Sequence, residues 1–195
     1  MKKFLIFLVA LLTFISADCQ QFLAMLRNNS NTVFNGYSRA IVIDKTNVPN
    51  TDLFDFPVKF TGTYSWLADE AHGGKVKTAY GRNNIVFQST TAVGVYDLKY
   101  QIVNYDSTTG FIEADIRVPK LSTTVNTSFY ITYGSTSVTT YHGDNSGTWN
   151  SGYAAVYHFG DGTTPFTGDA TANQINGTNH STTAAAGVMG GAANF

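Results

Sequence analysis

Alternation of apolar and polar residues is the strongest pattern in the sequence. In FIEADIRV, residues 111–118, one face would carry Ile112, Ala114, Ile116 and Val118 and the other Glu113, Asp115 and Arg117. A period of two is typical of a half-buried strand, so we expect the three charged side chains to face solvent. The preceding LKYQIVNY is joined to this strand by DSTTG, a short loop ending in glycine that is typical of a β-hairpin.

Further strands are predicted between residues 37 and 134. RAIVIDK is followed by FDFPVKF, in which Pro57 predicts an edge or bulged strand, and then by NNIVFQS, VYDLKYQIVNY and SFYITYG. Beyond the N-terminal apolar segment, no stretch of useful length has the period of a helix. Short strands separated by turn residues predict an all-β, antiparallel, jelly-roll-like β-sandwich over residues 37–142.

The pattern changes near residue 142. HGDNSGTWN is polar and contains glycine, and we interpret residues 143–152 as a linker. A strand is predicted to begin at Tyr153, after which the chain is rich in turn residues. A unit spanning 153–195 with one clear strand is too small to bury a core. We therefore expect it to be the first part of a second sandwich, and the natural chain to continue beyond Phe195.

The first residues have the pattern of a secretion signal. Lys2 and Lys3 precede an apolar run that ends at Ile15, and Ser16 and Ala17 are the small residues that a signal peptidase requires. The run is shorter than the roughly 20 residues of a membrane span. We interpret residues 1–17 as a signal peptide and 18–36 as a lead-in, and we expect a secreted or cell-surface protein.

Charge narrows the classes of partner. The formal net charge is −1 and only 13% of the residues are charged, so no basic surface indicates nucleic acid as a partner. The chain has one cysteine, which excludes an internal disulfide and a cysteine-based zinc site. Polysaccharide and other surface proteins remain as candidate partners.

Residues 37 to about 142 resemble an exported bacterial and archaeal family known as domain of unknown function 2341. The match rests on FDFPVKF, on NNIVFQS, on the hairpin LKYQIVNYDSTTGFIEADIRVPKLS and on SFYITYG. The resemblance implies a domain of multidomain surface proteins without established activity, often placed before a concanavalin A-like sandwich. Asn83 and Asn84 stand where that family has an acidic residue.

Residues from about 150 to 195 resemble the opening of a laminin-G-like, concanavalin A-like jelly roll. The match rests on WNSGYAAVYHFGDG, DATANQINGT and AAAGVMGGAANF. Only the first strands of such a domain are present. The resemblance implies that His158 is a core or near-core residue that bonds the following turn, rather than a ligand.

Four aromatic residues in or beside loops are candidate ligand-binding residues: Tyr64, Trp66, Tyr80 and Trp149. Flat rings stack on sugar faces, and tyrosine and tryptophan add a polar group at the edge. Ordinary packing at the rim of a sandwich is the alternative. Within this set, TYSWLAD, residues 63–69, is the segment we favour for binding a glycan.

Asp161, Asp169 and Asn173 are candidate calcium ligands, because calcium takes six to eight oxygen atoms. The alternative is that these side chains cap their own turns. No other cofactor is indicated by the sequence.

Catalysis is not expected. The chain has two glutamates, Glu70 and Glu113, and Glu113 with Asp115 forms an E-x-D pair. Glycoside hydrolysis needs two carboxylates that face each other across the scissile bond. Arg117 stands where a third carboxylate would extend the pair, and a solvated strand face explains these charges better.

The sequence thus predicts a non-enzymatic extracellular protein for recognition or adhesion, with polysaccharide as the favoured ligand. One alternative is a structural subunit of an extracellular assembly, completed by strand pairing with another chain through open strand edges. A further alternative is a fragment of a glycoside-active enzyme.

Overall fold

The computed structural model describes residues 35–91, 94–160, 164–187 and 191–194. The predicted signal peptide, nearly all of the lead-in and the candidate calcium ligand Asp161 lie outside these ranges. The described strands are β1 (Tyr37–Ile43), β2 (Leu53–Thr63), β3 (Ile85–Thr91), β4 (Gly94–Asp97), β5 (Lys99–Asp106), β6 (Phe111–Leu121), β7 (Thr127–Tyr133), β8 (Thr183–Ala186) and β9 (Gly191–Asn194). The described helices are short 3-10 turns: η1 (Lys45–Asn47), η2 (Ser65–Leu67), η3 (Glu70–His72), η4 (Gly81–Asn84) and η5 (Ser146–Thr148). None of them could cross a membrane.

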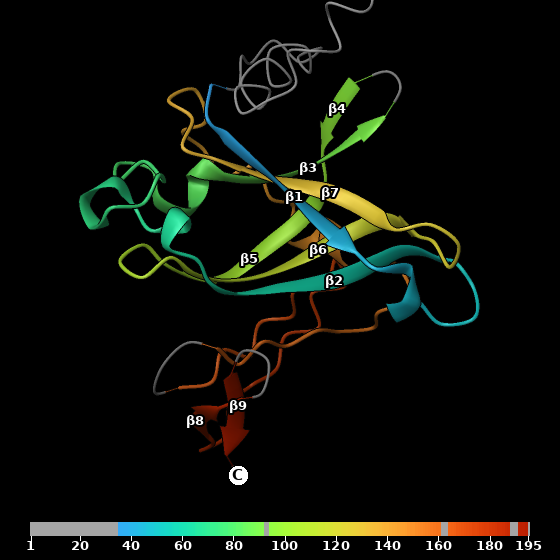
Figure 1. Cartoon of the computed structure of the whole chain (residues 1–195). Helices are drawn as coiled ribbons and strands as arrows, with labels where there is room; N and C mark the ends of the chain where they lie inside the picture. The colour runs from blue at the N-terminus through green and yellow to red at the C-terminus, as the bar shows by residue number, and fades with distance from the viewer. Residues whose placement is uncertain (1–34, 92–93, 161–163, 188–190, 195) are drawn as a thin grey trace, which may run out of the picture.

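Seven of these strands form two antiparallel sheets that pack face to face (Figure 1). The four-stranded sheet has the order β1-β7-β3-β4, and the three-stranded sheet has the order β2-β6-β5. The predicted all-β antiparallel sandwich is therefore confirmed. The strand with Pro57 is β2, at an edge of its sheet as predicted. β8 and β9 form a separate hairpin on the outer side of the three-stranded sheet.

Aromatic side chains join the two sheets. The ring of Phe87 on β3 lies 5.8 Å from the ring of Phe60 on β2 and 5.1 Å from that of Tyr100 on β5. The Tyr100 hydroxyl donates a hydrogen bond to the carbonyl of Ile85 across the sandwich, at 3.0 Å. Phe129 also contacts Phe87, so the core is centred on one phenyl ring.

The segment VYDLKYQIVNY, predicted as one strand, is divided between the two sheets. β4 pairs with β3 in the four-stranded sheet, whereas β5 pairs with β6 in the three-stranded sheet. Leu98 lies at the crossing, buried, with its amide bonded to the carbonyl of Phe87. A continuous alternating pattern did not reveal this change of sheet.

The predicted exposure of the charged face of β6 is wrong for two of its three residues. Glu113 is 6% exposed and Asp115 is 4% exposed, because later parts of the chain cover this face. Residues 144–150, interpreted as part of a linker, contact the sheet: Arg117 Nη1 donates to the carbonyl of Gly147, and Asn150 Nδ2 donates to that of Asp55. β6 is consequently buried on both sides.

Residues 153–160, predicted to begin a strand, are not part of a sheet. Their backbone makes isolated hydrogen bonds instead, such as those from Ala170 N to the carbonyl of Val156 and from Gly191 N to that of His158. Phe159 has a φ of 53°. This left-handed conformation interrupts an extended chain, so the apolar alternation here reflects packing against the sheet.

Asn84, at the end of η4, ties the loops at one end of the sandwich together. Its Oδ1 accepts hydrogen bonds from the amides of Lys77 and Gly134, at 3.1 and 2.9 Å. Its Nδ2 donates to the carbonyls of Ser135 and Val138, at 2.6 and 2.7 Å. The side chain is fully buried, and its amide makes all four bonds in a region without water contact.

Replacing this amide should therefore be costly. We expect Asn84→Ala to lower the free energy of unfolding by about 3 kcal/mol or more, since it leaves buried donors and acceptors without partners. The neighbouring half-buried Asn83 has no comparable side-chain bonds, and Asn83→Ala should cost about 0.5 kcal/mol or less. Urea unfolding of the two variants checks the prediction, and equal losses would contradict it.

Candidate functional site

A groove lined with aromatic residues lies between β1 and β2, at the edges of the two sheets. Its volume is about 510 Å³, within the range of small-molecule sites. We call it the aromatic groove. It is lined by Arg39, Ala40 and Ile41 of β1, Phe60 of β2, Ile131 of β7, and Tyr64 and Trp66, which follow β2.

Tyr64 and Trp66 are positioned by the turn that joins β5 to β6. The amide of Tyr64 donates to the carbonyl of Gly110 at 3.1 Å, and the Tyr105 hydroxyl donates to the carbonyl of Leu67 at 2.7 Å. Gly110 has a φ of +75°, and a Cβ there would lie 2.1 Å from the carbonyl oxygen of Tyr64. Only glycine allows this approach, so the hairpin loop and the groove depend on each other.

The groove belongs to a continuous row of five rings. Phe60 and Tyr64 are stacked, with centroids 5.2 Å apart, and Trp66 lies 5.1 Å from Tyr64. Trp66 is 4.9 Å from Tyr133, which stacks on Tyr37 at 5.7 Å. Since each ring contacts the next, the rings restrict one another's orientation.

Arg39 is held over this row. Its Nε donates to the Tyr133 hydroxyl at 3.2 Å, and its guanidinium carbon lies 4.7 Å from the centre of the Trp66 ring. Burial raises the pKa of Tyr133 above its ordinary value, so the phenol stays neutral. Lys75 lies 5.8 Å from the Tyr37 ring. In the described part of the chain neither cation forms an ion pair, and Arg39 is the charged residue among those that line the groove.

Of the four predicted aromatic residues, only Tyr64 and Trp66 line this groove. Tyr80 is half-buried at the start of η4, and Trp149 packs on the outer face of the three-stranded sheet, where its Nε1 donates to Gln101 Oε1 at 3.3 Å. Sequence reasoning missed Arg39. Alternation could have identified it: Arg39 lies on the same face of β1 as Tyr37 and Ile41, which is the face toward the core.

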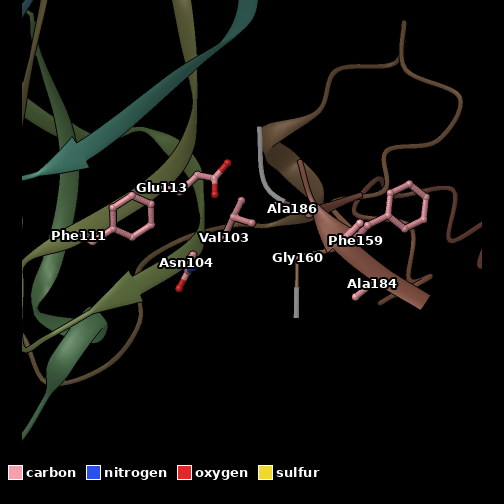
Figure 2. A pocket seen from close by; sticks show the side chains of 10 residues that line it. Val103, Asn104, Phe111, Glu113, Phe159, Gly160, Ala184 and Ala186 are labelled. Atoms are coloured by element: carbon pink, nitrogen blue, oxygen red, sulfur yellow. The ribbon is translucent and has the colours of Figure 1, made fainter. Parts of the chain in front are cut away.

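A second pocket, of about 410 Å³, lies between the outer face of the three-stranded sheet and the C-terminal segment. We call it the acidic pocket. Figure 2 shows Val103, Asn104, Phe111 and Glu113 on the sheet side, with Phe159, Gly160 and β8 opposite. The β5–β6 ladder shifts register between Ile102 and Asn104, and the resulting irregularity falls at Val103, in the pocket wall.

Two buried carboxylates share one lysine beside this pocket. Lys59 Nζ lies 2.9 Å from Glu113 Oε1 and 3.4 Å from Asp115 Oδ1. Lys59 is directly opposite Asp115 in the β2–β6 register, which places the ammonium group between the two acids. Asp115 Oδ2 is buried without a hydrogen bond. Desolvation raises the pKa of Asp115 above its ordinary value, although Lys59 and His158 oppose this shift.

His158 lies on the covered outer face of the sheet. Its Nε2 is 3.3 Å from Gln101 Oε1 and 4.0 Å from Asp115 Oδ2. Its ring lies 5.8 Å from that of Trp149, which in turn contacts Tyr153. These contacts attach residues 149–158 to the sheet.

The candidate calcium ligands have other bonds. Asp169 Oδ1 accepts from the amides of Val156 and Thr171, and Oδ2 accepts from Thr171 Oγ1 and the amide of Ile175. Desolvation opposes the effect of these bonds, which nevertheless lower the pKa of Asp169 to about 2. Asn173 donates its Nδ2 to the carbonyls of Tyr153 and Ala154. The described residues contain no group of three or more acidic, histidine or cysteine side chains suited to a metal ion.

No protein-family model, curated protein or solved structure matches the chain. The two family resemblances drawn from the sequence therefore stay predictions.

The buried position of Asp115 leads to a pH-dependent prediction. A carboxyl whose pKa is raised by folding destabilises the folded state above that pKa, and the penalty is lost as the pH falls through it. Relative to the unsubstituted protein, Asp115→Asn should therefore increase the free energy of unfolding more at pH 8 than at pH 4.5. Urea unfolding at both pH values measures this difference.

Asp52 provides a control, because its pKa is shifted in the opposite direction. Hydrogen bonds from Lys120 and Thr123 lower its pKa to about 2. The effect of Asp52→Asn should consequently stay constant between pH 8 and pH 4.5, because its pH-dependent window lies between about pH 4 and pH 2. If the effect of Asp115→Asn is equally constant, the assigned pKa direction is wrong.

Proposed function

We propose that this protein is a non-enzymatic, secreted or cell-surface protein that binds polysaccharide through the aromatic groove. The observation that carries the proposal is the convergence of Tyr64, Trp66 and Arg39 in one groove. Tyrosine and tryptophan rings offer an apolar face with a polar edge, which suits the alternating apolar and hydroxyl surfaces of a sugar. Export follows from the interpretation of residues 1–17 as a signal peptide.

The charges around the groove favour a polysaccharide that carries carboxylates. Arg39 uses Nε for Tyr133, and its two terminal nitrogens have no partner in the described part of the chain. A guanidinium group binds a carboxylate through two parallel hydrogen bonds. Among the described residues that line the groove, no side chain carries a negative charge. Polymers of uronic acids are therefore the class that fits best.

Trp66 should be essential for binding. We expect Trp66→Ala to weaken the binding of polygalacturonate at least about tenfold, as is usual when a central aromatic contact is removed. Tyr96, an exposed aromatic on β4 that is not among the groove residues, provides the control, and Tyr96→Ala should leave affinity unchanged. Affinity electrophoresis and calorimetry measure the effect, with urea unfolding to verify that the variants are folded. Equal affinities of the two variants would contradict the proposed site.

Arg39 should make the affinity depend on the negative charge of the polysaccharide. Arg39→Gln is expected to weaken binding of polygalacturonate about tenfold while changing little for its methyl-esterified form, in which the carboxylates are neutral. Arg39→Lys keeps the charge but loses the paired donors, and should bind with intermediate affinity. If the unsubstituted protein binds both polymers equally, the preference for acidic sugars is wrong, although the groove remains a polysaccharide site. If it binds no polysaccharide, the proposed function fails.

A second candidate function is self-association by strand pairing. β1 lies at the edge of the four-stranded sheet and exposes Val42 (59%) and Tyr37 (48%). Exposed edges pair with strands of other chains unless charges prevent it. If pairing is the function, the protein will show concentration-dependent mass in light scattering, and Val42→Lys will make it monomeric. A monomer at all concentrations would exclude this candidate.

A further inference from the structure

The acidic pocket contains a carboxylate oxygen to which no described residue donates a hydrogen bond. Glu113 lines the pocket and its side chain is only 8% exposed. Oε1 accepts from Lys59 Nζ at 2.9 Å, but Oε2 receives no hydrogen bond from any described residue. Because Glu113 lines the pocket, a ligand there could donate a hydrogen bond to this oxygen.

The charges beside the pocket favour a positive ligand. Glu113 and Asp115 together carry two negative charges when ionised, whereas Lys59 carries one positive charge. His158 is 4.0 Å from Asp115 Oδ2, on the side away from the Lys59 contact with Oδ1. A cation next to Glu113 Oε2 would balance the remaining negative charge.

The pocket walls favour an organic cation over a metal ion. Besides the carboxylate, the pocket offers the ring of Phe111, the side chain of Val103 and the small residues of β8 (Figure 2). The Phe159 ring points away from the sheet and stacks on that of Tyr157. Calcium and magnesium need six or more oxygen ligands, which these walls do not provide. A primary ammonium group needs hydrogen-bond acceptors at one end only, and its carbon body would contact the apolar side chains of Phe111, Val103 and β8.

We propose that the acidic pocket is a second binding site, which takes a primary ammonium group carried on a compact apolar body. The ammonium group donates to Glu113 Oε2, and the Asn104 side chain provides a further polar contact. Phe111 and Val103 on the sheet side and the alanines of β8 opposite enclose the body. The site shares no residue with the aromatic groove and goes beyond the proposed polysaccharide binding.

Cyclohexylamine and cyclohexanol test the proposal, because they differ mainly in the charged group. At pH 7.5 we expect cyclohexylamine to bind saturably in a calorimetric titration and cyclohexanol to bind at least about tenfold more weakly. In amide chemical-shift maps, the amine should perturb Asn104 and Gly160. Trp66→Ala should leave the amine affinity unchanged, which separates this site from the groove.

The two glutamates of the chain give a matched pair of variants. Glu113→Gln should lower the amine affinity at least about tenfold. Glu70→Gln also breaks a glutamate–lysine pair, that of Glu70 Oε1 with Lys77 Nζ at 2.6 Å, but outside the pocket, and should have no effect. If Glu113→Gln fails to fold, Ala184→Leu fills the pocket from β8 without changing the Glu113–Lys59 pair, and should abolish binding.

Three results would overturn the proposal. They are the absence of saturable amine binding, equal affinity for the amine and the alcohol, and an affinity that neither Glu113→Gln nor Ala184→Leu lowers. The first excludes a site, the second excludes recognition of charge, and the third places the binding elsewhere on the protein.

Discussion

The burial of β6 on both faces is the constraint on which the rest of the structure depends. Its inner face, with Ile112, Ala114 and Ile116, packs against the four-stranded sheet, as in any sandwich. Its outer face carries Glu113 and Asp115, and buried charges require partners. Lys59 supplies one because β2 pairs with β6 in the register that places it opposite Asp115. The sheet register therefore determines whether the outer face can be covered at all.

Two different ligand environments follow from this arrangement. The aromatic groove lies where β1 and β2 are edge strands of separate sheets, so side chains at the margin of the core remain accessible. The acidic pocket lies where the C-terminal segment covers the outer face incompletely. The first is positive because Arg39, which lines it, has no acidic partner among the described residues. The second is negative because two carboxylates share one lysine. The two sites should consequently select ligands of opposite charge.

The sequence predicted what depends on local pattern. Alternation located the strands, the hairpin before β6 and the all-β class, because side-chain direction in a strand is set by the residue's own position. Alternation could not show which segment of the chain covers the outer face of the three-stranded sheet. The sequence of residues 144–160 does not indicate which surface they cover, because their contacts with Gln101 and Arg117 join segments that are distant in sequence. For the same reason Tyr64 and Trp66 were identified from their chemistry and Arg39 was not, since its role depends on β1 and β2 being near each other at the open edge.

The polar groups between β6 and its cover explain why the C-terminal segment has a defined position. An apolar surface would accept several placements of a segment rich in glycine, alanine and threonine, whereas hydrogen bonds restrict them. Gln101 Oε1 accepts from Trp149 Nε1 and lies 3.3 Å from His158 Nε2, so one amide on β5 orients both rings. Lys59 is 2.9 Å from Glu113 Oε1 but 3.4 Å from Asp115 Oδ1, and Asp115 Oδ2 is buried without a hydrogen bond. The oxygen of Asp115 is sealed under the cover, and its cost appears as a raised pKa. Glu113 instead lines the pocket, so its second oxygen is where the proposed ammonium group would donate a hydrogen bond.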